Sequence, residues 1–305
     1  MSVTSSVLMV PPHTFQFNQE TSASNSFQST LSISNAADLA LFEFNNMVDT
    51  LRNEGVNVLI LNQDKILPDA VFPNNWFSTH LDDKGNTFVI IYPMLAVNRQ
   101  AEVTIDGLNQ VLSNTKIKVH QIIDLRTNEH EILEGTGSLV LDRANKLLYA
   151  ARSNRTSANI VEKVARLLEY QPIIFNSFDE DEHPVYHTNV VLSIAPKYVI
   201  ICLDSIKDKA QRSVLLKSFQ LTNKTVINIS HAQVRHMCGN VLELVNIHGE
   251  HLLILSSRAM HSFNKEQLNI IRCYSRLVSV NIDTIETIGG GSARCMMAEI
   301  FASVR

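Results

Sequence analysis

The side chain best suited to covalent chemistry in this sequence is a cysteine that follows a run of glycines. Cys295 comes after three glycines, residues 289–291, and directly after Arg294, and an apolar segment (residues 296–301) follows it. Glycines let a backbone bend and approach a ligand closely. A thiol attacks as its thiolate, which a nearby base or cation favours. We therefore interpret Cys295 as a candidate nucleophile. The alternative is a small buried strand residue, the usual role of a free cysteine.

Two further side chains could work with such a thiol. His187 lies between a tyrosine and an apolar segment and could act as general acid and base. Glu134 precedes two glycines in a mostly apolar stretch, where its carboxylate could orient an imidazole. The alternatives are a hydrogen-bonded strand histidine and a solvated turn glutamate. Three other histidines compete for the first role: His183, His231 and His236.

Asparagines mark two other places along the chain. Asn74 and Asn75 stand beside Trp76, the only tryptophan, and Asn189 follows His187 by two residues. Adjacent asparagines often form a turn. A tryptophan beside them also indicates a partly buried, shaped location.

These residues need a scaffold, and a repeat in the sequence indicates one. β-branched runs recur along the chain, and with Val58, Val119, Ile173, Val226 and Val278 as their markers the intervals are 61, 54, 53 and 52 residues. Alternating apolar residues and turn residues predict hairpins at 138–151, 190–203 and 241–256. Apolar residues at three- and four-residue intervals predict helices at 158–169, 206–219 and 265–274. The chain is thus an α/β protein of five similar units, which could form a ring or an open sheet.

The candidate residues fall at the same place in each unit, just before its second strand. The segments are 68–76, 133–137, 186–189, 235–240 and 289–295. If the units are equivalent, these segments converge, and convergence of cysteine, histidine, carboxylate and amides is how a site is assembled.

Composition narrows the class of protein. The 305 residues are 45% hydrophobic and 18% charged with a net charge of -4, typical of a globular protein and without the basic field of a nucleic-acid binder. No stretch reaches the roughly 18 apolar residues of a membrane span. Four cysteines without CxxC spacing indicate neither a disulfide scaffold nor a zinc site. We expect one cytoplasmic domain over residues 1–305, with no membrane or nucleic-acid partner; whether it forms a homo-oligomer is open.

From about residue 9 to 301, the chain resembles the guanidino-group modifying superfamily of arginine deiminases, dimethylarginine dimethylaminohydrolases and amidinotransferases. Leu133-Glu134-Gly135 resembles its Glu-Gly-Gly-Asp segment, His187-Thr188-Asn189 its His-x-Asp segment, and residues 290–295 its glycine-rich approach to the nucleophile. The resemblance implies a five-bladed α/β propeller, also called a pentein, built from ββαβ units.

The resemblance also implies roles for individual residues. Cys295 is expected to be the nucleophile, His187 the general acid and base, and Glu134 its partner. Arg99 and Arg155 resemble the arginines that hold a substrate α-carboxylate, for which the guanidinium fork is suited. Further substrate contacts are expected from Asp69 and Asn18. The resemblance implies neither a metal nor a cofactor.

Two departures from the family pattern bear on the substrate. Asn75 stands where Phe-x-x-Asp has its aspartate, and Asn189 stands where His-x-Asp has its own. Those aspartates grip a cationic guanidinium, whereas an amide can donate to a carbonyl oxygen and accept from an N–H. A neutral ureido group offers both. The spacing from Phe72 favours Asn75 over Asn74 as the contact.

The sequence therefore predicts hydrolysis of the ureido group of the amino acid citrulline, giving ornithine, ammonia and carbon dioxide through a covalent intermediate on Cys295. Within the superfamily, residues 69–76, residues 235–240 and Asn18-Gln19-Glu20-Thr21 resemble the citrulline hydrolase branch. Two alternatives remain: a deiminase or amidinotransferase acting on arginine or methylated arginine with the same three residues, and a non-catalytic module that binds amino acids. The order in which the leaving groups depart is open.

Overall fold

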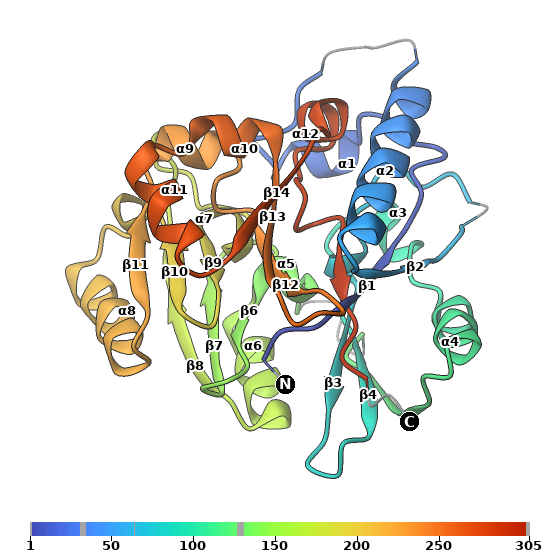
Figure 1. Ribbon diagram of the computed structural model, residues 1–305, viewed down its shortest axis with the longest axis horizontal. Coiled ribbons are helices and arrows are strands. Elements are labelled where there is room, and N and C mark those ends of the chain that lie inside the picture. Colours follow the sequence, from blue (N-terminus) through green and yellow to red (C-terminus); the bar gives the residue numbers. More distant parts are fainter. Residues whose placement is uncertain (1, 31–34, 64, 127–130, 303–305) are drawn as a thin grey trace.

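The computed structural model describes residues 2–30, 35–63, 65–126 and 131–302 (Figure 1). Its strands form five separate three-stranded sheets, which confirms the five predicted units and excludes a single open sheet for the described strands. In every sheet the middle strand runs antiparallel to the first and parallel to the third.

Four sheets use consecutive strands, and the fifth joins the two ends of the chain. The first four are β3 (Phe77–Leu81), β4 (Thr87–Ile91) and β5 (Val119–Asp124); β6 (Val140–Asp142), β7 (Leu147–Ala151) and β8 (Gln171–Phe175); β9 (Leu192–Ile194), β10 (Tyr198–Ile201) and β11 (Thr225–Asn228); and β12 (Leu242–Val245), β13 (His251–Ser256) and β14 (Arg276–Val280). The fifth is β15 (Ala298–Glu299), β1 (Ser6–Met9) and β2 (Asn57–Ile60).

A helical connection leads from each middle strand to the third, because parallel neighbours need a crossover. These helices are α2 (Ala36–Asn53), α4 (Ile105–Asn114), α6 (Ala158–Leu168), α8 (Lys209–Leu221), and α10 (Ser257–Ser262) with α11 (Lys265–Arg272). In Figure 1, α4 and α8 lie at opposite sides of the molecule, outside the strands. α6 packs its apolar face inward and ends where Glu169 adopts a left-handed conformation.

A short helical turn leads from each third strand into the next sheet. These turns are η1 (Pro73–Asn75), α5 (Gly135–Ser138), α7 (Thr188–Val191), α9 (His231–Arg235) and α12 (Asp283–Gly289). The remaining short helices are α1 (Gln19–Ser22), α3 (Val97–Gln100) and η2 (Leu203–Ser205).

The structure differs from the sequence expectations in three places. Residues 138 and 190–191, predicted to begin strands, lie in α5 and α7. The helix predicted from residue 206 begins at Lys209. The apolar segment 296–301 contains only the two-residue strand β15.

The first strands of neighbouring sheets meet at the centre of the packing. β6 contacts β9, β9 contacts β12, and β15 contacts β3. The middle strands are deeply buried: all four residues of β10 are buried, as are the last four of β7. Among the described residues, no helix combines the length and apolar character that a membrane crossing requires.

Candidate active site

The candidate nucleophile follows a backbone bend that glycine makes possible. Gly290 caps the C-terminal end of α12; it has φ +65° and would place an added Cβ 2.7 Å from the Asn25 side chain. A Cβ on Gly291 would lie 2.8 Å from the Phe72 ring. Cys295 then turns back, its N–H donating to the Ser292 carbonyl at 2.9 Å. The glycine run thus brings the backbone close to a ring and an amide and delivers a buried thiol.

Cys295 lies on a small cavity that collects most of the predicted site residues. The cavity, with an empty volume of about 260 Å³, is lined by Cys295 together with Asp69, Asn75, Arg99, Arg155 and His187, and also by Asn25, Phe72, Tyr186 and glycines 289–291. A larger hollow of about 1150 Å³, lined by residues of β3, β4 and α6 and of the loops beside them, contains no thiol. The units therefore bring together the segments that the repeat predicted would converge.

His187 and Glu134 form a buried pair. His187 Nε2 lies 2.7 Å from Glu134 Oε2, and the side chains are 2% and 0% exposed. Glu134 also accepts from the Leu95 N–H at 3.0 Å and from Arg155 Nη1 at 3.3 Å. The interpretation of Glu134 as a solvated turn residue is therefore wrong.

The charges around this pair decide its protonation. Burial alone would raise the pKa of Glu134, but Arg155, the hydrogen bond with His187, and Arg99 together lower it below its usual value. Burial lowers the pKa of His187 to about 4, although Glu134 opposes that shift. Glu134 is thus a carboxylate, and His187 is a neutral imidazole near pH 7.

The pairing also fixes the tautomer of His187. A carboxylate can only accept, so Nε2 carries the proton and Nδ1 holds the lone pair. Nδ1 makes no hydrogen bond to a described residue, and a Cβ on Gly137 would lie 2.8 Å from it. Gly137 therefore leaves room for the ring, and Nδ1 is the nitrogen available to take up a proton.

Asn75 is held in one orientation by Arg99. Arg99 Nη1 donates to Asn75 Oδ1 at 2.8 Å, and because a guanidinium only donates, the amide nitrogen must point away from it. Asn75 Nδ2 is buried without a partner among the described residues. Asn74 is buried too, and neither its side-chain oxygen nor its nitrogen has such a partner, but it does not line the cavity.

Arg99 is more completely engaged than the sequence suggested. Its Nε and Nη2 bind the two oxygens of Glu102, each at 2.9 Å, and Nη2 also donates to the Phe72 carbonyl at 3.1 Å. Burial would lower its pKa, but the pair with Glu102 and the charge of Asp69 raise it. Its predicted role toward a substrate carboxylate stays a prediction, because a carboxylate would have to share this guanidinium.

Asp69 carries an oxygen that is still free. Its Oδ2 accepts from Asn18 Nδ2 at 2.7 Å and from Thr21 Oγ1 at 3.1 Å, while Oδ1 is buried without a partner in the described chain. Burial raises the pKa of Asp69, and Arg99 partly offsets this effect. Asn18 itself does not line the cavity and positions Asp69 from behind.

Arg155 links the N-terminal segment to the His187–Glu134 pair. It donates to Ser24 Oγ from Nε and Nη2, at 3.1 and 2.6 Å, and to the Thr21 carbonyl at 3.1 Å. Its guanidinium lies 5.0 Å from the centre of the Tyr186 ring. Arg155 thus supports Glu134 and the cavity wall together, and its role toward substrate stays a prediction.

Asn189 and a residue that the sequence analysis left without a role lie against the thiol. Asn189 Nδ2 is 3.5 Å from Cys295 Sγ, and its Oδ1 has no partner in the described chain. Asn240 Nδ2 is closer, at 3.1 Å. Its position just before the first strand of the fourth sheet matches that of the other site residues, so the repeat contained the signal for it.

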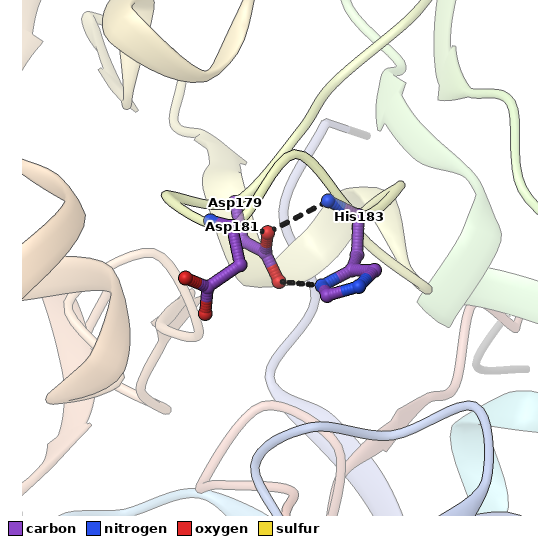
Figure 2. Close-up of side chains that lie close together, drawn as sticks. All are labelled: Asp179, Asp181 and His183. Atoms are coloured by element: carbon purple, nitrogen blue, oxygen red, sulfur yellow. Dashed lines mark hydrogen bonds and ion pairs between the residues drawn. The ribbon is translucent and has the colours of Figure 1, made fainter.

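The structure brings one group with metal-ligand geometry together, far along the chain from Cys295. Among the described residues searched, Asp179, Asp181 and His183 place one ligand atom each within 4.8 Å of one another. Figure 2 shows the Asp179 carboxylate turned toward the N–H and the ring of His183, at 2.9 and 3.7 Å. The Asp179 carboxylate thus accepts a hydrogen bond from the backbone of its own loop. None of these three residues lines the cavity.

Comparisons with solved structures identify proteins that share this fold. The N-terminal domain of ArgZ, an arginine dihydrolase from the ornithine–ammonia cycle in cyanobacteria, is similar as a cysteine-to-serine mutant bound to substrate, with a TM-score of 0.73, 14% identity and 96% of each chain covered. A cysteine-to-alanine mutant of AgrE with L-arginine gives 0.75 at 18% identity, where 98% of this chain covers 40% of AgrE.

A dimethylarginine dimethylaminohydrolase is similar over its whole length. Its histidine-to-glycine mutant, carrying an adduct with S-methyl-L-thiocitrulline, gives a TM-score of 0.64 at 16% identity, with 98% and 100% of the two chains covered. At such identities these likenesses show a shared α/β fold. Comparison with curated protein sequences gave no significant match.

A family profile provides the sequence-level assignment. The profile described as N,N dimethylarginine dimethylhydrolase, eukaryotic, matches residues 11–302, which include every predicted site residue. The chain therefore belongs to this dimethylarginine dimethylhydrolase family.

Proposed function

We propose that this protein is a cysteine-dependent hydrolase that cleaves a C–N bond in the terminal guanidino or ureido group of an amino acid. The proposal rests on one cavity that is lined by Cys295, His187 and Asp69, whose Oδ1 has no partner in the described chain. Glu134 lies directly behind the imidazole of His187. A thiol and an imidazole oriented by a carboxylate are the parts needed for covalent hydrolysis.

The proposed reaction has two stages. His187 Nδ1 takes the proton of the Cys295 thiol as Sγ attacks the central carbon and forms a C–S bond. The imidazolium then passes this proton to an amine, which leaves as its C–N bond breaks. His187 Nδ1 then takes a proton from water, which attacks the same carbon and breaks the C–S bond. Glu134 stabilises the imidazolium that forms between these steps. Because a urea or guanidine carbon is stabilised by resonance, placement and stabilisation of the developing charge must supply much of the catalysis.

A guanidine such as that of arginine is the substrate class that the comparisons favour. The family is described by dimethylarginine hydrolysis, and ArgZ and AgrE are associated with arginine by name or by bound ligand. The free Oδ1 of Asp69 could accept from a guanidinium N–H. This reading was the alternative in the sequence analysis, and the comparisons support it better than citrulline.

Citrulline remains a second candidate because of the two amides. Asn75 Nδ2 is an unpaired donor and Asn189 Oδ1 an unpaired acceptor, so the pair matches the carbonyl oxygen and N–H of a neutral ureido group. Hydrolysis of citrulline would release ammonia and leave a carbamate that decomposes to ornithine and carbon dioxide, or release ornithine first.

Direct turnover separates these candidates. The protein is incubated with citrulline, arginine or dimethylarginine, and ammonia, amine, citrulline and ornithine are measured. Ornithine from citrulline without turnover of arginine supports the ureido substrate, and the reverse supports the guanidine. Cys295→Ser should abolish turnover, whereas Cys202→Ser, at a buried thiol away from the cavity, should not. Saturable binding without turnover of any of them would favour a binding module.

We also infer that the five sheets are blades of one closed five-bladed ring, forming a single domain. The contacts between first strands support this closure, as does the hydrogen bond from Val245 N, at the end of β12, to the Thr4 carbonyl, at 3.1 Å. The four free cysteines support the proposal of a reducing, cytoplasmic location.

A further inference from the structure

Asn240 holds the candidate nucleophile at two points. Its Nδ2 donates to Cys295 Sγ at 3.1 Å, and its Oδ1 accepts from the Cys295 N–H at 3.4 Å. The side chain is 1% exposed, and Nδ2 also reaches the Asn189 carbonyl at 3.3 Å. Because a backbone N–H can only donate, Oδ1 must face it, and the amide N–H groups must therefore face the sulfur.

No other donor in the described part of the chain lies as close to the Cys295 sulfur. Asn189 Nδ2 is farther away, at 3.5 Å, and the protonated nitrogen of His187 donates to Glu134 instead of the sulfur. A hydrogen bond donated to the charged form of an acid favours that form. The two amides therefore act on the thiolate directly, at the atom that reacts.

We propose that Asn240 is a further catalytic residue whose side-chain amide stabilises the Cys295 thiolate in the free enzyme. This rests on the proposed function only in that Cys295 is the nucleophile. A guanidinium would bring its own positive charge to the thiolate, but a neutral ureido group would not. A built-in donor lets the same nucleophile attack either.

Other charged groups around the sulfur stay constant when Asn240 is changed. Arg294 precedes Cys295 and is buried beside it, Arg99 and Arg155 line the cavity as cations, and Asp69 and Tyr186 face the same space. Glu134 and His187 complete the set. A shift seen only on changing Asn240 therefore reports its amide.

The test follows alkylation of Cys295 by iodoacetamide as a function of pH, without substrate. A Cys273→Ser background removes the exposed thiol, and peptide mass spectrometry resolves Cys295 from the buried Cys202 and Cys238. Asn240→Ala should raise the apparent pKa of alkylation by about one unit, a roughly tenfold smaller thiolate fraction at neutral pH. Asn240→Asp should raise it further, because a carboxylate would face the thiolate.

A matched variant controls for loss of a buried asparagine. Asn246, in the turn after β12, is buried and makes no contact with the sulfur, so Asn246→Ala should keep the original pH profile. Thermal melting checks that each variant is folded, and if Asn240→Ala is not, the equally sized Asn240→Asp decides. An unchanged profile in a folded Asn240 variant overturns the proposal. Because no substrate is present, that result is separate from failure of the proposed reaction.

Discussion

His187 should make the stability of this protein fall as the solution becomes acidic, and the size of that effect follows from its burial. The imidazole is 2% exposed, and burial lowers its pKa from 6.5 to about 4. The unfolded chain then binds a proton more readily than the folded chain between these values. Stability is lost as pH falls through this window, and the loss is complete below the folded pKa.

The expected magnitude can be worked out from the same two values. A His187 pKa that is lower by about 2.5 in the folded state corresponds to a loss of roughly 3 kcal/mol in the free energy of unfolding at acidic pH. About 2 kcal/mol of this loss occurs between pH 7 and pH 5. Glu134, whose pKa is lowered, adds a loss in the same direction at lower pH, below its ordinary value of 4.5. Asp69, whose pKa burial raises, acts in the opposite direction. Only a comparison between variants therefore isolates His187.

Urea unfolding at pH 7 and pH 5 provides the measurement. The wild-type protein should lose about 2 kcal/mol more free energy of unfolding over this interval than His187→Gln, which has no imidazole to protonate. His120→Gln, at an exposed position on β5, should behave as wild type. Equal losses in the wild type and His187→Gln would refute the reasoning that this imidazole is held neutral by burial.

Two further changes test the surroundings of the His187–Glu134 pair, and a third tests a separate buried ion pair, Lys224 with Asp142. Glu134→Gln should reduce turnover at least about 100-fold, measured as ammonia release, because His187 loses the carboxylate that fixes its tautomer. Gly137→Ala should cost about 1–3 kcal/mol in urea unfolding and also reduce turnover, because its Cβ would lie 2.8 Å from the His187 ring. Lys224→Met should cost about 3–5 kcal/mol, because it leaves a buried carboxylate unpaired, whereas Lys146→Met, at an exposed pair, should cost less than about 1 kcal/mol.

How far the sequence could predict the fold depended on whether the signal was local. The strands and hairpins were predictable because turn residues and β-branched runs specify them locally. The turn α7 was not, because Thr188, Val190 and Val191 are β-branched and would by propensity extend a strand. There the packing of neighbouring units overrides local preference.

The sequence predicted where the site residues converge better than it predicted which residues their side chains bind. The repeat predicted that Glu134, His187 and Cys295 would converge, and in the structure His187 and Cys295 line one cavity with Glu134 behind the imidazole. The repeat could not predict that Arg99 binds Glu102, three residues later in the chain. From the sequence alone, the Arg99 side chain could equally have pointed to solvent. The repeat placed Asn240 in the converging segment 235–240, but it did not predict that the Asn240 amide contacts the Cys295 sulfur.

The ionic pairs inside the cavity bear on the charge of the substrate. Arg99 is paired with Glu102, and Arg155 is paired with Glu134, so each of these cations already has an anion. Asp69 is different, because its direct partners are an amide and a hydroxyl and one oxygen is unused. A buried carboxylate in that state gains from a substrate cation. Every α-amino acid brings an ammonium group, but arginine brings a guanidinium as well. One free carboxylate therefore matches one cation, and the second cation of arginine would need another anion, such as the Cys295 thiolate on the same cavity.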